Sequence, residues 1–148
     1  MKKTVLALCA AALLAVCLPA SHALAGPKKP TIVTSKSMAQ AKTKAKTKAK
    51  AMFTQRTVAF RMTENTKTRM LMSKTLPANI NDNNVLKNRT KGKPVMQVEL
   101  VFASENGKTR ITGDTWMLLD PKVKNKDKFN LLQTPDGKRL KKLLNQIR

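Results

Sequence analysis

The chain has 148 residues, a length that suits one small domain. Lys and Arg number 30 against eight Asp and Glu, so the formal net charge at pH 7 is +22. The two cysteines, Cys9 and Cys17, and the single histidine, His22, all precede residue 26, and tyrosine is absent. Residues 26–148 therefore lack the side chains for disulfides, for thiolate or imidazole metal sites, and for Ser-His-Asp or Cys-His catalysis. From the sequence we expect no enzyme, no cofactor and no metal site.

Residues 1–25 have the pattern of a secretory signal peptide. Two lysines precede an apolar run from Val5 to Leu18, and small residues stand at Ala23 and Ala25. The run is shorter than the roughly 18 to 20 residues that a membrane-spanning helix needs, so we expect cleavage rather than anchoring. The mature protein is expected to begin at Gly26 and to be periplasmic or secreted, with no integral membrane span.

Residues 26–54 are predicted to form a disordered, Lys-rich arm. Lysine occupies every second position from Lys42 to Lys50, and no acid occurs between Gly26 and Thr63. A segment with so much charge and so few large apolar side chains is expected to stay unfolded on its own. In composition, the alternating stretch resembles the Lys-Ala-Thr tails of histone-like linker proteins.

The arm is predicted to bind polyanions by charge, because ammonium groups neutralise phosphates without reading bases. The residues expected to do so are Lys42, Lys44, Lys46, Lys48 and Lys50. If all five engaged duplex phosphates, the logarithm of the affinity would fall against that of the salt concentration with a slope of about −4.5. The partner is expected to be nucleic acid, lipopolysaccharide or another anionic envelope polymer. The alternative is an envelope protein–protein interaction or assembly module in which the arm is only a soluble spacer.

Residues 55–148 are predicted to form a single small α+β domain, with an antiparallel sheet of about four or five strands. The first two strands are indicated by alternating apolar residues at Val58, Phe60 and Met62, and again at Met70 and Met72. We expect these strands to pair as a hairpin. The stretch 77–94 is rich in Asn, Gly and Pro, which favours a long loop.

A second hairpin is predicted around Asn106 and Gly107, because both residues tolerate the positive φ values of a type I′ turn. With these two residues as the loop, the apolar side chains share one face. The expected pairs are Glu105 with Lys108, Phe102 with Ile111, Val98 with Thr115, and Met96 with Met117.

The same register places Glu99 opposite Asp114, on the face away from the apolar residues. Facing carboxylates repel each other, so we expect a Lys or Arg bridge between them. A shared proton, a divalent cation or an acid–base pair would be the chemical alternatives. Trp116 falls on this face next to Gln97 and is a candidate contact for a partner or ligand, unless another segment covers it.

The C-terminal residues predict an amphipathic helix that packs on one face of the sheet, after a short strand near Phe129. Thr134, Pro135 and Asp136 supply an N-cap, a preformed first turn and an acid at the positive helix terminus. Apolar residues then repeat at helical spacing from Leu140. The basic residues on the other side extend the predicted polyanion site: Lys138, Lys141 and Lys142.

Overall fold

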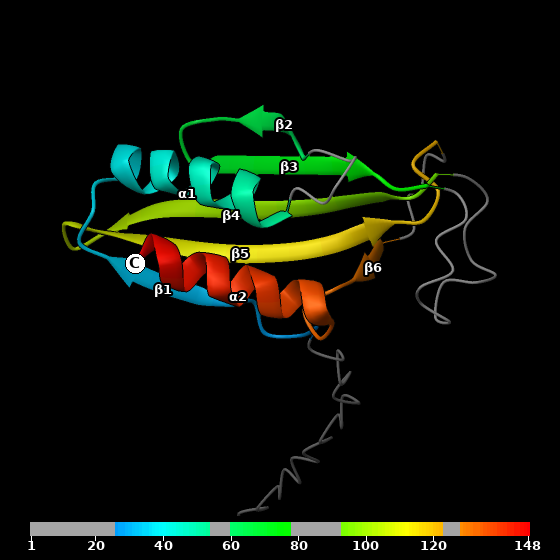
Figure 1. The fold of residues 1–148 in the computed structure, drawn as a ribbon. Helices are drawn as coiled ribbons and strands as arrows, with labels where there is room; N and C mark the ends of the chain where they lie inside the picture. The colour runs from blue at the N-terminus through cyan, green and yellow to red at the C-terminus, as the bar shows by residue number, and fades with distance from the viewer. Residues whose placement is uncertain (1–25, 54–59, 78–92, 123–127) are drawn as a thin grey trace, which may run out of the picture.

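The structure is a computed structural model that describes residues 26–53, 60–77, 93–122 and 128–148. Its elements are β1 (Thr31–Thr34), α1 (Met38–Phe53), β2 (Arg61–Asn65), β3 (Arg69–Thr75), β4 (Val95–Glu105), β5 (Lys108–Leu118), β6 (Lys128–Asn130) and α2 (Pro135–Ile147). The predicted α+β class is confirmed. In the described ranges the sheet is antiparallel with six strands in the order β1-β5-β4-β3-β2, and β6 pairs with β5. Both helices lie over one face of this sheet, side by side (Figure 1).

The β4–β5 hairpin forms with the predicted register. Asn106 has a φ of 49° and Gly107 a φ of 72°, as the tight turn requires. The four expected cross-strand pairs are all present, and Glu99 stands directly opposite Asp114. This hairpin is the longest ladder in the described chain and forms the middle of the sheet.

The other local predictions after residue 60 are also confirmed. β2 and β3 form a hairpin with a register shift between Met62 and Glu64, whereas Val58 and most of the predicted long loop lie outside the described residues. β6 is the short strand expected near Phe129. At the start of α2, the Thr134 hydroxyl accepts a hydrogen bond from the backbone N–H of Asp136 at 3.3 Å. Gly137 lies so close to the preceding turn that an added Cβ would stand 2.0 Å from the carbonyl oxygen of Leu132.

The prediction of a disordered arm is wrong for residues 31–53. β1 pairs with β5, and the 16 residues from Met38 to Phe53 form α1. The helix begins with a capping box: the Gln40 side chain accepts from the backbone N–H of Ser37 at 3.0 Å, and the Ser37 hydroxyl accepts from that of Gln40 at 3.3 Å. One stripe of α1 is buried, and the members of this stripe are Ala41, Ala45, Ala49 and Phe53.

The core lies between the sheet and the helices. Small alanine side chains let α1 approach α2 and β4 closely, and the larger residues of α2 fill the space beside them. The fully buried side chains include Val98, Leu100, Phe102, Ile111, Leu140 and Leu143. We call α1, α2 and their solvent-facing side chains the helical layer, and we call the side of the sheet without helices the open sheet face.

Candidate anion-binding surface

A four-residue repeat determines how the lysines of α1 are arranged. The sequence Ala-Lys-Thr-Lys runs from Ala41 to Lys44 and again from Ala45 to Lys48. In a helix a four-residue step turns about 400°, so equivalent positions fall almost on the same line along the axis, about 6 Å apart. The repeat therefore separates three kinds of side chain: alanine toward the core, threonine toward solvent, and lysine on both flanks.

The five lysines consequently form two rows, not the single row of an extended strand. Lys42, Lys46 and Lys50 make one row, and Lys44 and Lys48 make the other. Between them, Thr43 and Thr47 are exposed on the outer surface of α1, and the Thr47 hydroxyl donates to the carbonyl of Thr43 at 3.2 Å. Lys46, Lys48 and Lys50 are exposed, whereas Lys42 and Lys44 are half-buried.

Two contacts show which way each row faces. The Lys42 ammonium donates to the carbonyl of Thr66, in the turn between β2 and β3. Lys44 is influenced by Lys36, whose ammonium donates to the carbonyl of Arg148, just after α2, at 2.6 Å. The row that contains Lys42 thus borders the β2–β3 side, and the row that contains Lys44 borders α2.

The helical layer has many more cations than acids. α1 contains no acid, and the one acid of α2, Asp136, is paired with Arg139 at 3.0 Å. Partial burial and the positive charges of Lys36 and Lys48 lower the pKa of Lys44 below its ordinary value. Repulsion between neighbouring lysines is therefore felt at this surface, and a bound anion would relieve it.

The predicted site residues of α2 lie in the same layer. Lys138, Lys141 and Lys142 are exposed on the side of α2 opposite its buried leucines. The fold therefore brings the lysines of both helices to one side of the sheet, although α1 and α2 lie at opposite ends of the described chain (Figure 1).

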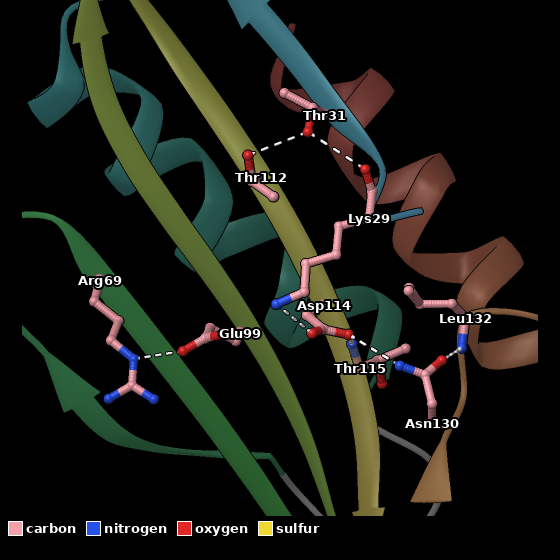
Figure 2. Close-up of polar contacts among 9 residues, drawn as sticks. All are labelled: Lys29, Thr31, Arg69, Glu99, Thr112, Asp114, Thr115, Asn130 and Leu132. Carbon is pink, nitrogen blue, oxygen red and sulfur yellow. Dashed lines mark hydrogen bonds and ion pairs between the residues drawn. The ribbon is translucent and has the colours of Figure 1, made fainter. Parts of the chain in front are cut away.

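The open sheet face differs from the helical layer because its acids are paired with cations. Asp114 receives the Lys29 ammonium at 2.8 Å, and Glu99 receives the Arg69 side chain at 2.5 Å (Figure 2). Arg69 also bridges to Glu64. Each of the facing carboxylates thus has a cation of its own, Lys29 for Asp114 and Arg69 for Glu99, instead of one Lys or Arg that bridges the two. The hydrogen bonds that the Arg69 guanidinium donates to the Glu64 and Glu99 carboxylates raise the pKa of Arg69.

Trp116 lies on this face but is only 7% exposed. Its indole N–H donates to the Gln97 side chain at 2.8 Å, and the ammonium of Lys128 stands 4.9 Å from the ring centroid. Gln97 in turn donates to Ser73 at 3.1 Å. The indole is therefore held inside a polar network of the sheet and presents little surface to a ligand.

One lysine is turned toward the core instead of toward solvent. Lys74 of β3 is 6% exposed, and its ammonium lies 5.2 Å from the centroid of the Phe60 ring. Burial lowers the pKa of Lys74. This position belongs to the packing of the sheet against the helices and is not part of the exposed cationic surface.

The described residues contain no group of three or more His, Cys, Asp or Glu side chains placed to hold a metal ion. None of the helices in the described ranges is long and apolar enough to span a membrane. Comparisons with protein families, curated proteins and solved structures find no match. The surface must therefore be interpreted from its own chemistry.

The lysines were predicted as site residues from the sequence, but the helix that carries them was not. Two signals for α1 were present: Ser37 and Gln40 at capping-box spacing, and alanines four residues apart that end at Phe53. The alternating lysines have a two-residue period, which is typical of an extended strand, whereas the alanines have the four-residue period of a helix.

Proposed function

We propose that this protein is an exported, small basic protein that binds polyanions through its helical layer by charge rather than by sequence. The candidate ligands share a chain of phosphate or other anionic groups. The binding residues proposed are the five lysines of α1 together with Lys138, Lys141 and Lys142 of α2.

The observation that supports this proposal is the unequal distribution of acids. The open sheet face has a Lys or Arg partner for Glu64, Glu99, Glu105 and Asp114. The helical layer has one acid, Asp136, among nine basic residues on α1 and α2. A surface with this composition attracts anions, and the attraction weakens as salt screens it.

Because α1 is an ordered helix, binding of a polyanion has a smaller conformational entropy cost than binding by a disordered arm would have. A disordered arm would lose conformational entropy when it bound, at roughly 1 kcal/mol or more for each backbone residue that becomes fixed. α1 is already folded and packed, so its lysine stems alone need to be ordered. Preorganisation of this kind improves affinity without additional contacts.

The experiment that tests the proposal compares two variants with the same net charge. The first removes three exposed lysines of α1: Lys46→Gln, Lys48→Gln and Lys50→Gln. The control removes three exposed lysines elsewhere: Lys67→Gln, Lys93→Gln and Lys122→Gln.

Binding to a duplex oligonucleotide is measured for both variants at several salt concentrations. We expect the α1 variant to lose up to about 2.7 units of the log-log salt slope, because three phosphate contacts disappear. The control is expected to keep a slope close to that of the unmodified protein. Equal losses in both variants would refute a binding surface on the helical layer.

Export is proposed on the signal-like pattern of residues 1–25. N-terminal sequencing of protein recovered from an exporting bacterial cell tests this, with Gly26 expected as the first residue. Recovery only from the cytoplasm with residues 1–25 retained would contradict export.

A second candidate function, protein docking through the open sheet face, is favoured by one observation. Val33 and Val101 are each 40% exposed on that face. Binding of a protein partner there would survive salt concentrations that abolish phosphate contacts, and it would be lost in Val33→Asp with Val101→Asp. A partner lost at moderate salt would favour the helical layer instead.

A further inference from the structure

We infer that the flank of α1 that borders α2 holds a site for one doubly charged phosphate group, bound by the ammonium groups of Lys44 and Lys48 and the hydroxyl of Thr43. The chemical class of ligand is a phosphate monoester, either as a small molecule or at the end of a larger one. The inference rests on the proposed function and deepens it, because it adds one selective point of attachment to binding by charge alone.

The first argument is that three cations converge here without a carboxylate among them. The ammonium groups of Lys44 and Lys36 lie next to each other, and Lys48 stands one turn further along α1. None of the ion pairs among the described residues includes any of these three lysines. Burial and the two neighbouring charges lower the pKa of Lys44, and a bound anion would oppose the effect of those charges.

One of the three cations, Lys36, is held in place by the fold. Its ammonium donates to the carbonyl of Arg148 at 2.6 Å, so it contributes its charge to the site and not a direct contact. Its own carbonyl accepts from the Thr109 hydroxyl at 2.8 Å, and its backbone N–H donates to the Thr34 hydroxyl at 3.3 Å. The positive charge beside Lys44 is therefore built into the connection between β1 and α1.

The second argument is the arrangement of donors around an open hollow on the surface of α1. The hollow is lined by Ala39, Gln40, Thr43, Lys44, Thr47 and Lys48. One line along the helix, with a spacing of four residues, contains Gln40, Lys44 and Lys48, and the two threonines form a second line beside it. The Thr47 hydroxyl donates to the carbonyl of Thr43 at 3.2 Å. The hydroxyl of Thr43 makes no hydrogen bond to another described residue, so it can donate to a phosphate oxygen beside the two ammonium groups.

The third argument is the charge of the ligand. A phosphate monoester carries a charge of about −1.5 to −2 at pH 7, because its second pKa is near 6, and its oxygens are strong acceptors. A phosphate diester, such as one unit of a nucleic-acid backbone, carries a single negative charge and leaves more of the cluster without a counter-charge. Three clustered cations therefore favour the monoester.

The test measures binding of inorganic phosphate, phenyl phosphate and dimethyl phosphate to the protein by NMR at constant ionic strength. The first two are mainly doubly charged slightly above neutral pH, whereas the third is a singly charged diester. Backbone amide signals locate the bound anion, and we expect their largest shifts between residues 40 and 48. Dimethyl phosphate should bind about fivefold more weakly, as the loss of one exposed charge contact would produce. Equal affinity for the diester would overturn the selectivity of the site.

Two variants with the same loss of charge show whether the site is local. Lys44→Gln with Lys48→Gln should weaken phosphate binding about tenfold or more, because hydrogen bonds between charged groups are lost. Lys67→Gln with Lys122→Gln removes two exposed lysines elsewhere and should leave the phosphate affinity unchanged. An equal loss in the two variants would mean that phosphate responds to net charge and has no site on α1.

The two threonines provide a second matched pair, without any change of charge. Thr43→Val removes the hydroxyl proposed to donate to the ligand and should weaken phosphate binding about fivefold. Thr47→Val removes a hydroxyl that already donates within the helix and should have little effect. The reverse order would exclude Thr43 from the site.

The pH dependence provides a readout that protein stability does not determine. Residues 26–148 contain no histidine, so between about pH 7.5 and 5.5 the group that titrates is the phosphate itself. Binding of phenyl phosphate should weaken about fivefold as the pH falls and the monoester gains a proton. Binding of dimethyl phosphate should stay constant, and a parallel decline of both ligands would contradict a site for a doubly charged group.

Two further pairs of ligands identify the source of the phosphate. One pair is an oligonucleotide with and without a 5′-phosphate, and the other is phosphatidylcholine vesicles that contain equal amounts of either phosphatidic acid or phosphatidylglycerol. Only the first member of each pair has a monoester, and tighter binding of that member identifies the source. If neither pair shows this preference while salt-sensitive oligonucleotide binding persists, the site is wrong and the proposed function stands. If no anion binds at all, both are refuted.

Discussion

The helical layer and the open sheet face lie on opposite sides of the same sheet, and they differ in how their charged side chains are paired. On the open sheet face, Asp114 and Glu99 each contact a cation from a neighbouring segment (Figure 2). In the helical layer, lysines lie beside other lysines, and the pKa of Lys44 is lowered by burial and by that proximity. Among the described residues, α1 and α2 therefore carry an excess of cations, whereas the acids of the open sheet face are paired with cations.

The two regions also differ in what their charges contribute to folding. Ion pairs on the open sheet face join segments far apart in the sequence, such as Lys29 and Asp114, and so support the sheet. Like charges four residues apart on a helix destabilise it by about 0.2–0.5 kcal/mol for each pair. The helical layer is therefore stabilised by its buried stripe despite its lysines.

The largest expected effect comes from disrupting the packing of α1. Ala45 is fully buried, so Ala45→Leu should lower the free energy of unfolding by about 1–3 kcal/mol through overpacking. Ala51→Leu is the matched control, because Ala51 is exposed on the same helix. Urea denaturation measures both. Equal stability of the two variants would mean that α1 does not pack as the structure shows.

The next effect comes from the open sheet face. Lys29→Met removes the cation beside the buried Asp114 carboxylate. We expect the free energy of unfolding to fall by about 1 kcal/mol. This is small for a hydrogen bond between charged groups, because the Lys29 side chain is 53% exposed and solvent screens the pair. Lys28→Met, one residue earlier and also exposed, should leave the urea midpoint unchanged.

The same pair predicts a pH dependence with a definite sign. The hydrogen bond to Asp114 raises the pKa of Lys29 above 10.5. The pair with Asp114 contributes fully to the stability of the protein below pH 10.5, the ordinary pKa of lysine. This contribution is lost as the pH rises through the higher pKa that Lys29 has in the folded state. The decline of stability at alkaline pH should be shallower in Lys29→Met than in the unmodified protein, and parallel curves would contradict this account.

A smaller effect, of opposite sign, is expected in the helical layer. Removing Lys46, Lys48 and Lys50 as glutamines abolishes three like-charge pairs four residues apart on α1. Glutamine and lysine have similar helix propensities, so at low salt the variant should gain about 1 kcal/mol of unfolding free energy. Thermal denaturation in low and high salt measures this. A gain that persists in high salt would show that repulsion is not its cause.

The smallest effect concerns an exposed ion pair. Glu105 and Arg110 bridge on the open sheet face, where their side chains are 38% and 49% exposed. Glu105→Gln should therefore change the unfolding free energy by only about 0.2–1 kcal/mol. A loss greater than that of Lys29→Met would invalidate the distinction between buried and exposed pairs on this face.

The parts of the fold that the sequence predicted well are those with local rules. Asn106 and Gly107 specify a two-residue turn, and that turn fixes every pair of the β4–β5 ladder, including Glu99 with Asp114. The N-cap at Thr134 and the apolar spacing from Leu140 specify α2 in the same way. Cations beside the two carboxylates were expected in kind, but Lys29 and Arg69 could not be named, because Lys29 comes from the segment before β1 and Arg69 comes from β3.

The sequence-based prediction was wrong for α1, because the charge of this segment was given more weight than its packing. Alanine, lysine, methionine and glutamine are among the strongest helix formers, and three repulsive pairs cost only about 1 kcal/mol. Burying Ala41, Ala45, Ala49 and Phe53 against the rest of the core outweighs that cost. The capping box and the alanine spacing favoured a helix, but how far this stripe is buried depends on the surface that receives it.

The sequence by itself determined the excess of cations, the exclusion of Cys- and His-based chemistry after residue 25, the central hairpin and the C-terminal helix. These features depend on composition or on neighbours within a few residues. Only the tertiary structure decided that the lysines stand in two rows on an ordered helix beside α2, and which cations pair with the carboxylates of the sheet. The reason is that the exposure and partner of each side chain depend on segments brought together from opposite ends of the chain, and no local pattern encodes them.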